Sequence, residues 1–139
     1  MLRRLALAAG LLAAGAAGAA ELSVRIDLSD QRMDVLLRGV ALYEDWPVST
    51  ARAGKVTPLG SFTPERLARW HYSTLYDGAP MPWSIFFRGN YAIHGTTAVD
   101  RLGGPASAGC VRLAPENAER LFALVQAVGM QATEIVIEP

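Results

Sequence analysis

Beyond its first twenty residues, the chain opens with alternating apolar and polar residues, which is the pattern of strands with one buried face. Residues 22–28 (LSVRIDL) alternate strictly, and residues 33–37 repeat the period of two after a short polar turn. Residues 40–48 form a third run, in which Pro47 indicates an edge strand or a strand end because proline lacks a ladder N–H. The three runs predict an antiparallel meander.

The next part of the chain predicts loops and two further extended segments. Residues 49–59 contain glycine, lysine and proline and predict a loop, after which residues 60–64 predict a short extended piece. Residues 70–76 are rich in aromatic and β-branched residues and predict a strand. Residues 77–80 (DGAP) predict the turn that ends it.

A hairpin is predicted immediately before the first candidate for chemistry. Residues 83–88 and 91–93 are mostly apolar or aromatic, and the two residues between them are Gly-Asn. A two-residue connection of this kind is typical of a tight β-hairpin. His94 is therefore expected at the end of a strand.

One helix is predicted near the carboxyl end. Pro115 suits the first helical position because its φ is already helical, and Gly129 is a natural stop. Between them the apolar residues fall at i, i+3, i+4, i+7 and i+10 and form one stripe: Ala118, Leu121, Phe122, Val125 and Val128. Residues 134–138 alternate again and predict a last strand. The expected fold is mainly β with one packed helix.

The first twenty residues are interpreted separately from the fold. Arg3 and Arg4 precede an apolar run, and small residues follow up to position 20, which is the pattern of a secretory signal peptide. An uncleaved membrane anchor is the alternative, but the run is short and rich in Ala and Gly compared with the ~20 strongly apolar residues of a span. We expect a signal peptide at 1–20, an exported domain at 21–139, and a periplasmic or cell-envelope location.

The charge balance gives no indication of a nucleic-acid partner. The full chain has 13 Lys+Arg and 13 Asp+Glu, and without Arg3 and Arg4 the balance is 11 − 13 = −2. No basic stripe or charge run is present, and no metal-ligand spacing predicts a bound ion or another cofactor.

The aromatic-rich stretch around residues 70–87 has a structural interpretation. His71 is expected to be a packed or surface histidine. Four aromatic side chains are expected in the core rather than on a substrate platform: Trp70, Trp83, Phe86 and Phe87.

Cys110 and His94 are the candidates for chemistry. Cys110 is the only cysteine, so it cannot form an internal disulfide, and a buried thiol acting as a small hydrophobe is the ordinary alternative. A thiol is nucleophilic as thiolate, and at a free pKa of about 8.5 little is ionised at neutral pH. A nearby imidazole such as that of His94 corrects this by accepting the proton. The pair predicts a cysteine acyltransferase or hydrolase.

The residues beside the pair suggest supporting roles. Gly95 allows close backbone approach, and Gly109 allows a sharp turn that exposes a nucleophile. The backbone N–H groups around Gly109 and Cys110 are expected to face a developing oxyanion, where one donor is worth roughly 3 kcal/mol. Arg112 is placed either to bind a carboxylate or to anchor the turn as a structural hydrogen-bond donor.

These motifs resemble the L,D-transpeptidase catalytic domain, the YkuD-type family of peptidoglycan enzymes. That family has His-Gly and then, after a loop, Ser/Thr-His-Gly-Cys, an apolar residue and Arg or Asn. The resemblance covers the whole chain after residue 20, including segments similar to the family's first strand and its Thr-Pro-x-Gly-x-Phe element. The matching segments are residues 24–31, 57–62, 82–87, 93–95 and, with Ser107 first, 107–112.

The resemblance implies a β-sandwich-like fold and a mechanism. Cys110 attacks the L-centre carbonyl of a diamino acid in a tetrapeptide stem and releases D-alanine, with His94 as base and the Gly95 carbonyl holding the imidazole. The thioester then passes to an amine, giving a 3–3 cross-link or attaching a cell-wall protein. The implied partners are stem peptides and an amine acceptor, the implied role is in cell-wall organisation and cell shape, and carbapenems are implied to acylate the thiol.

One position departs from the family pattern. Ala108 stands where the family has a second histidine, which is implied to assist near the oxyanion or the substrate. Its loss leaves the Cys110–His94 pair in place and affects rate and acceptor choice. The alternatives are an L,D-carboxypeptidase or peptidoglycan peptidase with the same site, and a weakly active protein that binds peptidoglycan.

Overall fold

The computed structural model describes residues 20–73 and 78–139, so apart from Ala20 the predicted signal segment lies outside the described residues. These residues form nine strands, one α-helix and two short 3-10 turns. The strands are β1 (Leu22–Asp27), β2 (Arg32–Leu37), β3 (Val40–Ser49), β4 (Gly60–Phe62), β5 (Arg66–Ala68), β6 (Ser84–Arg88), β7 (Tyr91–Gly95), β8 (Val111–Leu113) and β9 (Thr133–Glu138). The helix is α2 (Pro115–Val128), and the turns are η2 (Val99–Arg101) and η3 (Met130–Ala132).

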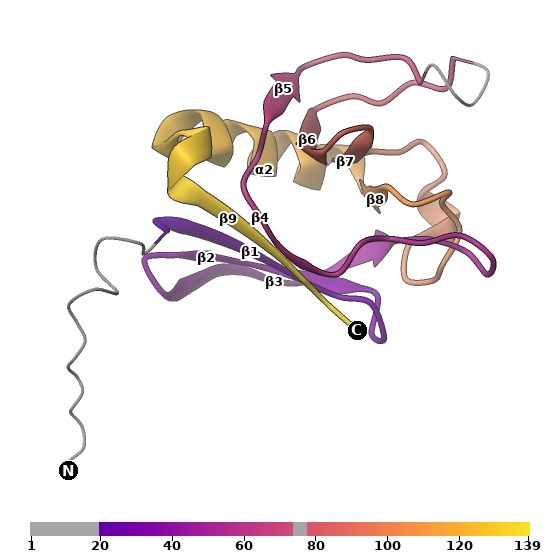
Figure 1. The fold of residues 1–139 in the computed structure, drawn as a ribbon, viewed down its shortest axis with the longest axis horizontal. Helices are drawn as coiled ribbons and strands as arrows, with labels where there is room; N and C mark the ends of the chain where they lie inside the picture. Colours follow the sequence, from indigo (N-terminus) through magenta and orange to yellow (C-terminus); the bar gives the residue numbers. More distant parts are fainter. Residues whose placement is uncertain (1–19, 74–77) are drawn as a thin grey trace, which may run out of the picture.

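The nine strands make one curled sheet. Their order is β4-β9-β1-β2-β3-β8-β7-β6-β5, and β3 joins the halves because it pairs with β2 along most of its length and with β8 through Val48 and Ser49. Figure 1 shows the β9–β1–β2–β3 half below the β6–β7–β8 half, with α2 beside the upper strands. The expected mainly β, sandwich-like fold with one packed helix is confirmed.

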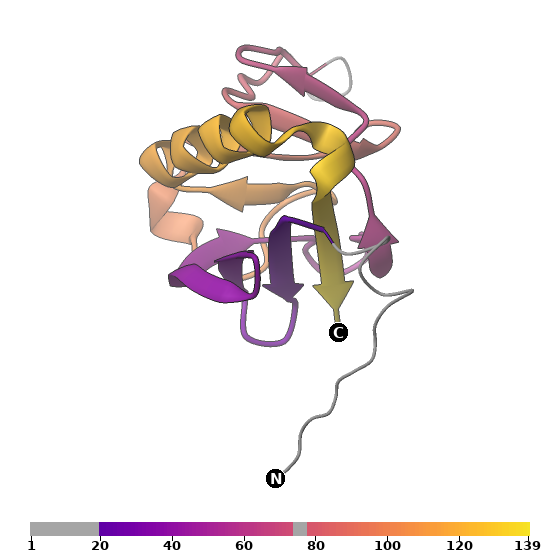
Figure 2. The same cartoon turned by 90° about the vertical axis from the view of Figure 1, so that its left-hand side faces the viewer.

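The meander and the carboxyl-terminal elements form as predicted. β1 pairs antiparallel with β2, and β2 with β3. Pro47, expected at an edge or at a strand end, lies instead near the point where β3 passes from β2 to β8. The predicted last strand, β9, lies parallel to β1, and Figure 2 shows the two side by side. Within the described residues, no helix is long and apolar enough to span a membrane.

Helix α2 covers the core with the predicted apolar stripe. It begins at Pro115 and is capped at Gly129, as the sequence indicates. Four of the five stripe residues are buried, and Val128 is half-buried at the last turn. The helix packs mainly against β7, so the same contacts that bury its stripe also fix the strand that carries His94.

The strand predicted at residues 70–76 is wrong within its described part. The strand in this region is β5, which ends at Ala68, and residues 70–73 form only one isolated bridge, between Tyr72 and Pro80; residues 74–76 lie outside the described residues. Trp70, expected in the core, is 56% exposed and packs edge-on against Tyr72. The other three aromatic residues are buried or half-buried, as expected: Trp83, Phe86 and Phe87.

Candidate active site

Neighbouring parallel strands bring the candidate residues to one face of the sheet. β7 and β8 are parallel, and their register places His94 opposite Arg112. Cys110 precedes Arg112 by two residues, so the alternation of side chains directs the thiol to the same face. Ile93, which precedes His94, and Val111, which lies between Cys110 and Arg112, are buried in the core on the opposite face. The strand pairing therefore joins two sequence motifs in one site.

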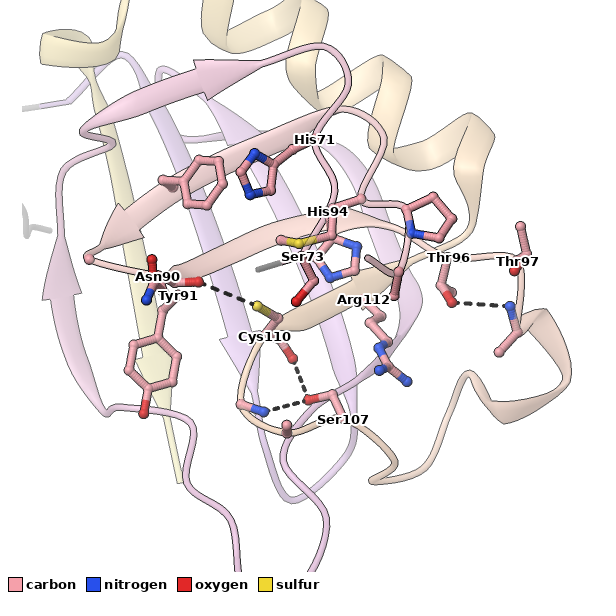
Figure 3. Close-up of a pocket in the computed structure, with 18 of the residues that line it drawn as sticks. His71, Ser73, Asn90, Tyr91, His94, Thr96, Thr97, Ser107, Cys110 and Arg112 are labelled. Atoms are coloured by element: carbon pink, nitrogen blue, oxygen red, sulfur yellow. Dashed lines mark hydrogen bonds between the residues drawn. The ribbon is translucent and has the colours of Figure 1, made fainter. Parts of the chain in front are cut away.

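A cavity of about 610 Å³ opens on this face. Figure 3 shows His94, Cys110 and Arg112 pointing into it, with His71 on the side opposite Ser107. The cavity lies between the β6–β7 hairpin, the turn before β8 and the segment that carries His71. Its size is within the range of pockets that bind small molecules or peptide segments.

Ser107 organises the turn that presents the thiol. Its hydroxyl donates to the Cys110 carbonyl oxygen at 2.6 Å and accepts from the Gly109 N–H at 3.0 Å. The Ser107 side chain is buried, so these bonds are shielded from water. They change one expectation, because the Gly109 N–H is occupied by Ser107 and does not face the cavity as a free donor.

A second polar residue holds the turn from the other side. The Thr57 hydroxyl donates to the Gly109 carbonyl oxygen at 2.8 Å and accepts from the Ala51 N–H at 3.0 Å. Thr57 is buried, and it fastens the loop before β4 to the turn before β8. The Thr-Pro-x-Gly-x-Phe element that begins at Thr57 is therefore a structural support of the candidate site.

Gly109 is required by both space and backbone conformation. Its φ is +145°, and a Cβ at this position would lie 2.6 Å from Tyr91 Cε1 and 2.8 Å from the Val56 carbonyl oxygen. We expect Gly109→Ala to lower the free energy of unfolding by about 2–4 kcal/mol or to displace the turn. Chemical denaturation and the rate of thiol acylation measure the two outcomes.

Gly104→Ala is the matched control for this substitution. No atom lies within 4 Å of a Cβ at Gly104, and its φ is not left-handed. We expect its free energy of unfolding to change by no more than about 0.5 kcal/mol. If Gly109→Ala were as stable and as reactive as Gly104→Ala, the turn would not depend on the glycine.

The thiol of Cys110 is held in its neutral form. Burial raises the pKa of the thiol, while the Ala92 backbone N–H and the charge of Arg112 act in the opposite direction. The Sγ–H donates to the Asn90 carbonyl oxygen at 3.7 Å, a contact visible in Figure 3. The resting nucleophile is thus a protonated thiol that needs a base.

His94 is neutral and has a defined tautomer. Burial lowers the pKa of His94 to about 4; the hydrogen bond to the Gly95 carbonyl raises it, and the charges of Arg112 and His71 lower it. Nδ1 lies 2.7 Å from the Gly95 carbonyl oxygen, so we assign the proton to Nδ1. This leaves Nε2 with a free lone pair that can accept the proton of a thiol.

The backbone next to His94 is tightly packed. A Cβ on Gly95 would lie 3.3 Å from Pro115 Cα and 3.3 Å from Pro82 Cγ. The Gly95 N–H donates to the Pro82 carbonyl oxygen at 2.9 Å. The start of α2 and the segment before β6 thus fix the carbonyl that orients the imidazole.

Five of the six predicted site residues line the cavity: His94, Ser107, Gly109, Cys110 and Arg112. The sixth, Gly95, contacts His94 through its carbonyl oxygen. Arg112 is half-buried, and burial lowers the pKa of its guanidinium; among the described residues it forms no ion pair. An unpaired guanidinium beside the thiol is suited to bind an anionic group.

Sequence reasoning gave no role in the site to three residues that the structure adds to it. Asn90 acts through its backbone carbonyl, Thr57 through its hydroxyl, and His71 through a ring that faces the cavity. Thr57 begins the Thr-Pro-x-Gly-x-Phe element noted in the sequence, but no local pattern predicts the three contacts, because each joins segments that are distant along the chain. Within residues 20–73 and 78–139, no group of three or more His, Cys, Asp or Glu could hold a metal ion.

The chain is similar to known proteins in sequence family and in fold. The family model described as the L,D-transpeptidase catalytic domain (YkuD) matches residues 22–137. No curated protein matches the chain.

Three solved structures illustrate the similarity in fold. An L,D-transpeptidase from Mycobacterium smegmatis is 21% identical, with a TM-score of 0.77 over 86% of this chain and 59% of its own. One from Xylanimonas cellulosilytica is 25% identical, with a TM-score of 0.74 over 86% and 61%. The L,D-transpeptidase LdtMt1 in complex with imipenem is 21% identical, with a TM-score of 0.75 over 86% and 59%. The chain thus spans about three fifths of the length of these proteins.

Proposed function

Because this chain belongs to the YkuD family of L,D-transpeptidase catalytic domains, we propose that it is a cysteine-dependent acyltransferase acting on the peptide stems of peptidoglycan. The observation that carries the proposal is the neutral pair formed by the Cys110 thiol and the His94 imidazole on one cavity wall. The tautomer that leaves Nε2 free, held by the Gly95 carbonyl, supports the role of His94 as base.

In the first half-reaction Cys110 forms a thioester. Its sulfur attacks the L-centre carbonyl of the diamino acid in a tetrapeptide stem, while His94 Nε2 takes the thiol proton. The peptide C–N bond then breaks, the proton passes from His94 to the departing amine, and D-alanine leaves. The S–H is positioned on the Asn90 carbonyl before the reaction, so it must turn towards His94 as substrate binds.

In the second half-reaction an amine replaces the thiol. The amine attacks the thioester carbonyl and gives a proton to His94, the C–S bond breaks, and the thiol regains a proton. A second stem as acceptor gives a 3–3 cross-link, and a cell-wall protein as acceptor gives an attached protein. Water as acceptor makes the same site an L,D-carboxypeptidase.

We assign the stabilisation of the oxyanion to the backbone N–H of Cys110 rather than to that of Gly109. The Gly109 N–H is hydrogen-bonded to Ser107 and is available only if that bond breaks. Ala108 lines the cavity next to these groups but brings no polar side chain. Arg112 is the remaining charged group beside the thiol, and we assign it to an anionic part of the substrate.

The location and the inhibitor class follow from the same proposal. An enzyme that acts on peptidoglycan stems works outside the cytoplasm, so we place the domain in the periplasm or cell envelope. Imipenem, a carbapenem, is bound by an L,D-transpeptidase of the same fold. We expect carbapenems to acylate Cys110.

Purified disaccharide-tetrapeptide is the direct test of the function. We expect incubation with residues 21–139 to release D-alanine and to give a dimer lighter than two monomers by one D-alanine, as measured by mass spectrometry. Release of D-alanine with only tripeptide formed would favour the carboxypeptidase. Unchanged tetrapeptide, with binding to sacculi retained, would favour the weakly active binding protein and refute the transferase.

A further inference from the structure

His71 lies on a strap, residues 69–73, that runs beside the cavity between β5 and β6. The strap is held by a ladder of backbone hydrogen bonds to the segment before β6. The Trp83 N–H donates to the Arg69 carbonyl at 2.8 Å, and the Met81 N–H donates to the His71 carbonyl at 2.7 Å. The backbone of His71 is therefore fixed relative to β6.

Alternation along the strap turns His71 towards the cavity. Its neighbours Trp70 and Tyr72 are 56% and 57% exposed, whereas His71 is half-buried and lines the cavity. The His71 ring packs edge-on against Phe86 with the ring centroids 5.1 Å apart. Phe86 is itself buried and belongs to β6, so its ring supports the imidazole from behind.

The hydrogen-bonding groups of the His71 ring are its two nitrogens. Among the residues that the structure describes, neither ring nitrogen forms a hydrogen bond. A half-buried imidazole with a free N–H is a ready donor for a ligand. In Figure 3, His71 lies on the side of the cavity opposite Ser107.

The charge of the cavity indicates which ligand group His71 meets. Among the described residues no carboxylate lines the cavity, whereas Arg88, Arg112 and two histidines do. Such a lining favours an anionic substrate. Arg112 lies beside the thiol in β8, and Arg88 is exposed at the end of β6, so among the described residues His71 is the basic side chain that lines the cavity from the strap.

We propose that His71 is a substrate-binding residue of this site, and that its ring N–H binds the carboxylate of the terminal D-alanine of the tetrapeptide. The inference rests on the proposed function and adds the recognition of the leaving residue to it. That carboxylate lies only one residue beyond the attacked carbonyl, so a group across the cavity from Cys110 can reach it.

The test compares a tetrapeptide that ends in a free carboxylate with the same peptide ending in a carboxamide. For each, KM and kcat for release of the terminal residue are measured with the wild type, His71→Ala, His71→Gln and the control Tyr72→Ala, whose side chain points away from the cavity. We expect His71→Ala to raise KM for the carboxylate about tenfold with kcat within about twofold. Glutamine retains an N–H donor and is expected to recover most of this loss.

The carboxamide identifies the group that His71 binds. We expect amidation to raise KM about tenfold for the wild type and for Tyr72→Ala, and to have no further effect in His71→Ala. Two results would overturn the role of His71 but leave the proposed function standing. One is an equal rise in KM on amidation in His71→Ala and in the wild type; the other is an unchanged KM for the carboxylate peptide in His71→Ala. If the wild type released the terminal residue from neither peptide, the proposed function would fall together with this inference.

Discussion

Replacing Cys110 by alanine is expected to abolish covalent capture of imipenem while the fold remains intact. In the wild type the thiol adds to the β-lactam carbonyl and the ring C–N bond opens, so the whole inhibitor is retained and the intact mass rises by the mass of imipenem. Cys110 is the only thiol in the chain. No other side chain of the described cavity has comparable nucleophilicity at neutral pH.

The structural cost of this substitution is small. Cys110 is half-buried, and its side chain makes one long hydrogen bond, 3.7 Å to the Asn90 carbonyl oxygen. Removing one sulfur atom from such a site costs about 1 kcal/mol, and we expect a shift of only a few degrees in thermal unfolding. Cys110→Ser is the matched control, because it retains a hydroxyl in the same turn but is a far weaker nucleophile. An imipenem adduct on Cys110→Ala would refute the assignment of the nucleophile.

The local part of the fold was predictable from sequence because each signal acts within a few residues. The Gly89-Asn90 turn forms the hairpin whose second strand carries His94 next to its last residue, and Pro115 and Gly129 bound the helix as predicted. The strand predicted at residues 70–76 failed over its described part, residues 70–73, for a physical reason. Its aromatic residues suit a pleated surface, but the strap leaves the sheet after Ala68, and Trp70 is exposed beyond it.

The non-local part of the site was not predictable from spacing. The parallel pairing of β7 with β8 joins His94 to the Cys110 turn, and no local pattern fixes that register. The bond from the Gly109 N–H to Ser107 also changes the expected oxyanion donor, because small residues in a turn can bond to each other as well as to a substrate. His71 was expected to be packed or on the surface, and it packs on Phe86 while it also lines the cavity.

Replacing His94 by alanine is expected to slow acylation by imipenem at pH 7 by about a hundredfold to ten-thousandfold, because the neutral thiol then loses its base. His94→Gln is the control for volume, since it fills the space and can still hydrogen-bond to the Gly95 carbonyl. Both variants should be equally slow if proton transfer, and not packing, is what His94 supplies. Stopped-flow acylation with an intact-mass endpoint measures the rates.

The pH profile separates a neutral pair from a pre-formed thiolate–imidazolium pair. Burial lowers the pKa of His94 to about 4 and raises that of Cys110, so both shifts favour the uncharged forms. Protonation of His94 removes the base; the wild-type rate should therefore be constant from neutrality down to about pH 5 and fall as the pH drops through about 4. In His94→Ala this acid limb should vanish, and the rate should instead rise with pH in the alkaline range as the thiol ionises. Thiolate absorbance near 240 nm in the wild type at pH 6 would contradict the neutral pair, because an ion pair absorbs there and a thiol does not.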